Sequence, residues 1–316
     1  MTNGQRRISL RAAVSLEVIL LGTVASLWLP GGEDLHAFYL PFARGCLECG
    51  FPPYHASWLL APLALVPTRL AWPLLTLLTL AGLAWLSHRL GSNPLVVLLA
   101  FPTMAQVWLG QVDVLIVAGL ALALLSSNPY LRGAGLLLAS VKPQTAGAAI
   151  LVLLWYDEER WKTLTIPALA LGISLLVWGV DWPLRWLLAD RHPHQHAWRL
   201  ATLYPGGLLA FAGVALLKGK RQKLVGALLA SAVGLPYYGV YAYVTFLAFL
   251  APWWALPVSY LWLAAYPWLG NLSLQLAWVL PLTLLGHLLW PSMRAASAAA
   301  RERWKARVGQ QNLKNH

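Results

Sequence analysis

Long apolar runs, separated by short polar connections, fill most of this chain of 316 residues. They cover residues 12–29, 70–88, 94–109, 112–126, 133–156, 163–180, 206–217, 224–235, 239–251, 255–269 and 272–290. Hydrophobic residues make up 59% of the chain and charged residues 11%, whereas about a quarter of the residues in a soluble domain are charged. The sequence therefore predicts an all-α, polytopic transmembrane helix bundle with about 10–12 membrane segments, half-helices included.

The basic residues predict how this bundle lies in the cell membrane. The first run follows three arginines and is too long for a typical signal-peptide core, so we expect a retained helix with a cytoplasmic N-terminus. Other basic connections fall on the same face, namely Arg89, Arg132, Arg160, Lys162, Lys218, Lys220, Arg221 and Lys223. Residues 1–290 are predicted to form one transmembrane domain, and residues 291–316 a basic cytoplasmic tail. The net charge of +12 thus reflects topology and not nucleic-acid binding.

Lys142 lies in the middle of the apolar run 133–156 and is followed at once by Pro143 and Gln144. A lysine at that depth is costly unless it is paired or hydrated, and a proline interrupts the helix beside it. The run is therefore predicted to form two half-helices that meet at Lys142. A lysine that extends to the interface is the alternative, but the position favours a site for an anionic ligand.

Several polar residues are predicted to meet on the outer face. Glu33 and Asp34 follow the first run, Gln111 and Asp113 lie at a turn between two runs, and Lys142 lies at the outer end of its hairpin. Carboxylates, an amide and a cation are the groups that bind a phosphate and activate a hydroxyl. Each pair alone is typical of a solvated loop or a turn, so the prediction depends on their convergence.

At these residues the chain resembles the GT-C glycosyltransferases of family 87. The first resemblance consists of GEDLHAFY at 32–39, FPPY at 51–54 and LAPLALVP at 60–67. The second consists of GQVD at 110–113, RG at 132–133, VKPQ at 141–144 and RW at 160–161. The resemblance covers roughly the first half of the chain, with motifs that are short but ordered. It implies a GT-C type of helix bundle whose first outer loop carries the active site.

The resemblance implies transfer of a sugar, mannose or a pentose, from a polyprenyl-phosphate donor to a lipid or glycan acceptor outside the membrane. The family's catalytic base matches Asp34, and direct displacement at the anomeric carbon would invert its configuration. Together with the polar residues above, the expected substrate-binding residues are Glu33, His36, Tyr39, Tyr54, Gln111, Asp113, Lys142, Gln144 and Tyr237. Asp113 replaces an asparagine frequent in the family and is a possible counter-ion for Lys142. His55 is not carried over.

No cofactor is expected, and a divalent metal is not favoured. His192, His194 and His196 alternate in one outer connection, but such a loop is more often an interfacial or phosphate-contacting segment. Cys46 and Cys49 cannot complete a four-ligand zinc site alone, so they are predicted to form a local disulfide or to remain free thiols.

A membrane transporter or lipid flippase is the alternative function. In that class Lys142 and Asp113 would form a substrate site on broken helices near the middle of the membrane. The two halves of the chain show no convincing inverted repeat, however, and the acidic outer loop has no evident role in transport. We therefore favour the enzyme, in which Asp34, Gln111 and Lys142 should line one outward-open, lipid-accessible cavity, whereas a transporter should place its charges on a path across the whole bundle.

Overall fold

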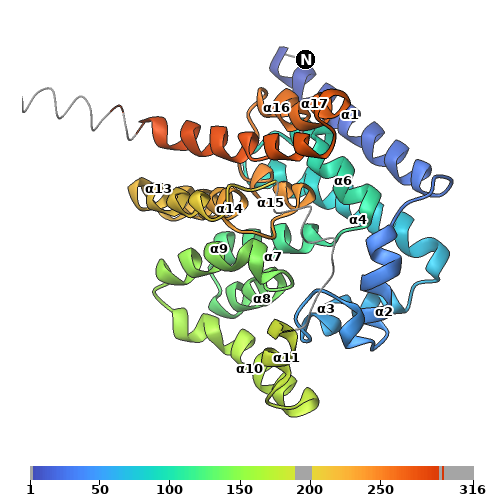
Figure 1. The fold of residues 1–316 in the computed structure, drawn as a ribbon, viewed down its shortest axis with the longest axis vertical. Coiled ribbons are helices and arrows are strands. Elements are labelled where there is room, and N and C mark those ends of the chain that lie inside the picture. The colour runs from blue at the N-terminus through green and yellow to red at the C-terminus, as the bar shows by residue number, and fades with distance from the viewer. Residues whose placement is uncertain (1–2, 189–200, 292–293, 295–316) are drawn as a thin grey trace, which may run out of the picture.

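The computed structural model describes residues 3–188, 201–291 and 294, without the side chains of residues 3–10. The predicted histidine segment 192–196 and nearly all of the predicted tail lie outside the described residues. Within the described part every regular element is a helix, so the all-α prediction is confirmed (Figure 1).

The first half of the chain forms ten α-helices and two shorter elements. The α-helices are α1 (Asn3–Ser26), α2 (Leu40–Ala43), α3 (Ala56–Ala64), α4 (Thr68–Arg89), α5 (Pro94–Leu99), α6 (Phe101–Leu109), α7 (Asp113–Leu125), α8 (Pro129–Ala139), α9 (Pro143–Trp155) and α10 (Arg160–Trp178). A π-helix, η1 (Leu35–Tyr39), and a 3-10 helix, η2 (Leu47–Cys49), lie in the first long connection.

The helices of the second half are shorter. They are α11 (Trp182–Leu188), α13 (Ala210–Leu216), α14 (Lys220–Gly234), α15 (Val244–Leu247), α16 (Ala255–Ser259) and α17 (Leu261–Leu269), with a final helix over Val279–Pro291. Three 3-10 helices connect them: η3 (Gly206–Leu209), η4 (Val240–Tyr243) and η5 (Gly270–Leu276).

Helix length limits how many of these elements span a membrane. Among the described residues, α4 and α10 are long and apolar enough to cross alone, and two bent helix pairs bring the number to up to 4. The prediction of ten to twelve segments, half-helices included, rests on hydropathy, which does not distinguish lipid-facing from core residues. Residues 239–251 illustrate this, since they form η4 and a single turn, α15, whose Val244, Phe246 and Leu247 are completely buried.

Two helix breaks were anticipated by the sequence and one was not. Residues 140–142 separate α8 from α9, as the two half-helices predict. The predicted turn at Gly110 also exists, and α6 and α7 bend there by 119°. The expected helix 94–109 is instead divided at Ala100 into α5 and α6, because Pro102 cannot continue a helix across that point.

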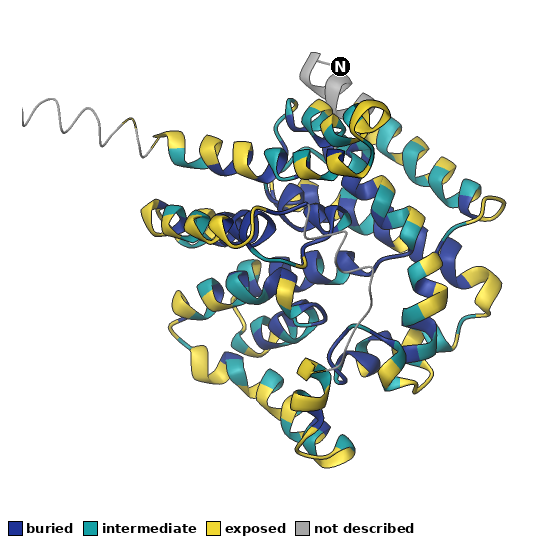
Figure 2. Cartoon of the chain, viewed as in Figure 1, coloured by how far each residue is buried: buried dark blue, intermediate teal, exposed yellow. Residues whose placement is uncertain are grey.

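The buried residues, dark blue in Figure 2, form one large core, a second, smaller cluster and a third group of Val214, Ala227 and Ala230. The large core lies between α4, α7, α9 and α14, and every residue of α14 from Leu224 to Gly234 is buried. The smaller cluster joins η1, α2 and α3 to the start of α4 and to Val112 and Val141. It therefore connects the first long connection to both helix breaks.

The first connection also contains a disulfide between Cys46 and Cys49, whose Cα atoms are 5.3 Å apart. Of the two predicted alternatives, the local disulfide is the one present. Disulfides persist in oxidising compartments, which agrees with the predicted outer position of this connection.

Candidate active site

A glycine turn brings the first connection against the corner between α6 and α7. Gly110 ends α6 with φ of 70°, and a Cβ atom there would lie 2.7 Å from Leu35 Cβ and 2.9 Å from Gly32 Cα. The Gly32 amide donates a hydrogen bond of 2.7 Å to the Trp108 carbonyl. Only a residue without a side chain fits this position, so the close approach depends on Gly110.

Gln111, the next residue, lies at the centre of a hydrogen-bonded cluster. Its Oε1 accepts hydrogen bonds from the Tyr39 hydroxyl, at 2.7 Å, and from Lys142 Nζ. Since both partners are donors, the orientation of the amide is fixed and Nε2 must be the donor on the other side. Nε2 donates to Asp34 Oδ2. The predicted convergence of Asp34, Gln111 and Lys142 is therefore present.

Lys142 is buried and paired with Asp113. The distance from Nζ to Asp113 Oδ2 is 2.6 Å, and the two residues are 4% and 0% exposed. The ammonium also lies 4.8 Å from the centre of the Tyr241 ring. The anticipated counter-ion role of Asp113 is confirmed, and the other oxygen of this carboxylate, Oδ1, is buried without a hydrogen-bond partner.

The Asp34 carboxyl group differs from that of Asp113 because Asp34 is only partly buried, whereas Asp113 is fully buried. Burial raises the pKa of Asp34, and the positive charge of Lys142 and the hydrogen bond from Gln111 partly offset that effect. All of its hydrogen bonding is through Oδ2, so Oδ1 is free to accept a proton. A carboxylate with a raised pKa is a stronger base than an ordinary aspartate.

Other predicted site residues lie outside this cluster. Glu33 and His36 are exposed on either side of Asp34, and Gln144 is exposed in the first turn of α9. We expected Gln144 to add a donor beside Lys142, but Pro143 begins a new helix there and directs the next side chain outward. The substrate-binding roles of these three residues remain predictions.

Two tyrosines are placed differently from expectation. Tyr54 is 4% exposed and stacks on Trp182, with ring centres 5.3 Å apart, so it is part of the smaller buried cluster. Tyr237 is 41% exposed, whereas Tyr241, four residues later, contacts Lys142. The sequence marked this break between two apolar runs but did not identify which of its tyrosines faces the site.

His55 is a polar residue near the site that the sequence analysis set aside. Its Nε2 lies 2.9 Å from Ser140 Oγ, and that hydroxyl donates to the Leu137 carbonyl at 2.7 Å. Because the Ser140 hydroxyl proton is donated to Leu137, Ser140 Oγ can only accept from the histidine, and His55 Nε2 is the donor. Burial lowers the pKa of His55 to about 4, which leaves the imidazole neutral at pH 7. A neutral histidine therefore fixes Ser140, two residues before Lys142.

An apolar cavity lies beside the Gly32 turn. It has a volume of about 230 Å³ and is bounded by α1, α4 and α6, with Leu29, Trp72 and Trp108 among its lining residues. The Trp72 indole donates to the Val107 carbonyl at 2.8 Å, and its ring lies against Gly32. Trp72 therefore lies between the cavity and Gly32, and none of Asp34, Gln111 and Lys142 lines this cavity.

The described residues contain no group of three histidine, cysteine or carboxylate side chains that could hold a metal ion. Within the site, the Asp34 carboxylate is bound to Gln111 and the Asp113 carboxylate to Lys142. The described residues of the site therefore present an amide and an ammonium group beside the Asp34 carboxylate.

Residues 51–193 match the family model of glycosyltransferase family 87. The match supports a glycosyltransferase similar to family 87. The matched region contains Gln111, Asp113 and Lys142, and the hydrogen bond from Gln111 connects it to Asp34, which precedes it. No curated protein and no solved structure matches the chain.

Proposed function

We propose that this glycosyltransferase moves a sugar, mannose or a pentose, from a polyprenyl-phosphate donor to a lipid or glycan acceptor on the extracytoplasmic side of the cell membrane. The observation that supports this proposal best is the arrangement of Asp34. One of its oxygens accepts a hydrogen bond from Gln111, which Lys142 holds in turn, while the other oxygen has no hydrogen bond among the described residues.

The reaction we propose is a single displacement with Asp34 as general base. The acceptor hydroxyl gives its proton to Asp34 Oδ1 as its oxygen attacks the anomeric carbon. The bond from that carbon to the phosphate oxygen breaks, and polyprenyl phosphate leaves with the bonding electrons. Attack from the face opposite to the leaving group inverts the anomeric configuration. Gln111 keeps the carboxylate in place through these steps.

Lys142 has two roles in this proposal. Two of its three N–H donors are bound to Gln111 and Asp113, which fixes the amide that holds Asp34. The third N–H and the positive charge remain for a phosphate oxygen of the donor. Charge grows on that phosphate as it leaves, so a fixed cation in a site of low dielectric constant stabilises the transition state more than the ground state.

The apolar cavity beside Gly32 suits the hydrocarbon part of the donor. Its lining is formed almost entirely by aliphatic and aromatic side chains, and it opens along α1 and α4. Isoprenoid chains carry no hydrogen-bonding groups, so an apolar wall is sufficient to hold them. The carrier would then present its phosphate toward the Asp34 and Lys142 cluster.

A transporter has one observation in its favour, the buried pair of Lys142 and Asp113, which joins the break between α8 and α9 to the break between α6 and α7. An assay that separates the two functions uses purified protein in detergent, where no gradient exists. We expect transfer from one member of a panel of polyprenyl-phosphate sugars, release of polyprenyl phosphate in equal amount and an inverted anomeric centre in the product. Nucleotide sugars, as the control donors, should give no product. A product formed from nucleotide sugars, or with retained configuration, would contradict the proposal.

A further inference from the structure

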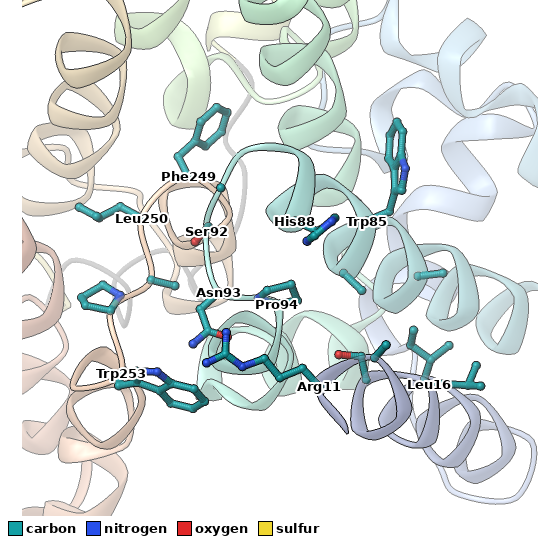
Figure 3. A pocket seen from close by; sticks show the side chains of 18 residues that line it. Arg11, Leu16, Trp85, His88, Ser92, Asn93, Pro94, Phe249, Leu250 and Trp253 are labelled. Atoms are coloured by element: carbon teal, nitrogen blue, oxygen red, sulfur yellow. The ribbon is translucent and has the colours of Figure 1, made fainter. Parts of the chain in front are cut away.

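A second cavity, of about 840 Å³, lies at the other end of α1 from the active site. It is enclosed by α1, the end of α4, the start of α5 and the segment 249–253 (Figure 3). Arg11 in this cavity precedes Ser26, at the active-site end of α1, by 15 residues, or about 22 Å of helix. The two sites are therefore separated by most of the thickness of a membrane.

The mouth of this cavity is basic. Arg11 extends across it from α1 toward Asn93, and its guanidinium lies 5.8 Å from the centre of the Trp253 ring (Figure 3). Arg11 has no carboxylate partner among the described residues, and none of the lining residues is acidic. His88 adds a second nitrogen base to the lining. The position is therefore suited to an anion.

The wall behind Arg11 is fixed by another arginine. The Arg221 guanidinium donates to the carbonyls of Leu90 and Phe249, the latter at 3.3 Å. These two residues belong to the end of α4 and to the segment that closes the cavity, so Arg221 holds both in place. Its charge lies behind the cavity wall and adds to the positive potential there.

The interior of the cavity is apolar between α1 and α4. Leu16 and Ile19 on α1 face Ala81, Ala84 and Trp85 on α4 across this part of the cavity. An occupant must therefore combine an anionic group, near Arg11, with a hydrocarbon part that extends along α1. A free phosphate ion would contact only the basic end at Arg11, and a neutral hydrocarbon only the apolar interior.

We propose that this cavity binds an anionic phospholipid of the cytoplasmic leaflet. Its phosphate would contact Arg11, whose planar guanidinium pairs with phosphate oxygens in a bidentate manner, and one acyl chain would lie between α1 and α4. The predicted topology places this end of α1 in the leaflet that carries most of the anionic lipid. The site is independent of the transfer reaction and would exist if the proposed donor were wrong.

The test uses purified full-length protein in lipid nanodiscs with a photoactivatable phosphatidylglycerol, whose acyl chain carries the reactive group. We expect cross-links to the segments 11–19 and 81–94, and roughly fivefold fewer with the matching phosphatidylcholine probe. Arg11→Gln should reduce the phosphatidylglycerol cross-links by a similar factor. Ser15→Phe, which fills the cavity without changing charge, should also reduce them.

The matched control is Arg160→Gln, which removes an exposed arginine predicted to lie on the same face but outside the cavity. It should leave the cross-links unchanged. Three results would overturn the proposal: equal labelling by the two probes, wild-type labelling in Arg11→Gln, or an equal loss in Arg160→Gln. Displacement of the probe by unlabelled polyprenyl phosphate, at concentrations where phosphatidylglycerol has no effect, would show that the cavity holds the carrier instead.

Discussion

The pair of Lys142 and Asp113 should dominate the stability of the active-site region. In Lys142→Met, Asp113 Oδ2 loses its cation while Oδ1 already has no partner, and the carboxylate remains 0% exposed. Removing one member of a buried ion pair costs about 3–5 kcal/mol, because the other charge stays buried and uncompensated. We expect that loss in the free energy of unfolding of this variant.

The loss can be expressed as a change in melting temperature. At about 2.1 cal/mol/K per residue, 316 residues give an unfolding entropy of about 0.66 kcal/mol/K. A loss of 3–5 kcal/mol then lowers the melting temperature by about 5–8 °C. The double variant Lys142→Met/Asp113→Leu removes both charges at similar volume, and we expect it to melt within about 2 °C of the wild type.

The measurement is thermal unfolding in one detergent, followed by tryptophan fluorescence, for the wild type, both single variants and the double variant. The double variant should be more stable than either single variant. If Lys142→Met lowered the melting temperature by less than about 1.5 °C, or if the two losses simply added, Lys142 and Asp113 would not be coupled. The proposed fixation of Gln111 by Lys142 would then lose its basis.

Three further predictions concern packing, protonation and topology. Gly119→Val should lower the free energy of unfolding by at least about 1–3 kcal/mol, because a Cβ atom at residue 119 would lie 2.5 Å from the Gly135 carbonyl oxygen. The control is Gly147→Ala, where the new Cβ atom meets open space, and it should be neutral or stabilising in the same melting assay. Burial raises the pKa of Asp34, so kcat/KM should fall as the pH drops through a value above the pKa of an ordinary aspartate. The positive charge of Lys142 lowers the pKa of Asp34, so Lys142→Met should move this fall in kcat/KM to higher pH. A pH profile that does not move would contradict the charge coupling. A cysteine at Lys220 should resist an impermeant maleimide in intact cells and one at Glu48 should react, whereas labelling at Lys220 would contradict the predicted topology.

The sequence predicted the parts of the site that depend on local chemistry. Pro143 and Gly110 mark the two breaks, and a lysine within an apolar run requires a counter-ion, which Asp113 supplies. Tyr241 could not be placed, because its contact with Lys142 joins segments 99 residues apart whose packing no local pattern encodes. The exposure of the Gln144 side chain likewise depends on the residue at which α9 begins, which the sequence pattern did not fix.

The predicted number of membrane segments depends on hydropathy, which has a related ambiguity. Hydropathy reports that a side chain avoids water but not whether lipid or protein surrounds it. In α14 every residue from Leu224 to Gly234 is buried in protein, whereas most of α10 is exposed on the surface of the bundle. The sequences of these two helices give the same apolar signal.

The proposal that Asp34 acts as general base is tested most directly by the turnover of Asp34→Asn in the detergent assay. The amide has the same shape but cannot take a proton from the acceptor, so we expect turnover to fall by about 10²–10⁴-fold at unchanged melting temperature. Glu48→Gln, the control for an exposed carboxylate in the same connection, should retain wild-type turnover. Near-normal turnover of Asp34→Asn would remove Asp34 from the mechanism.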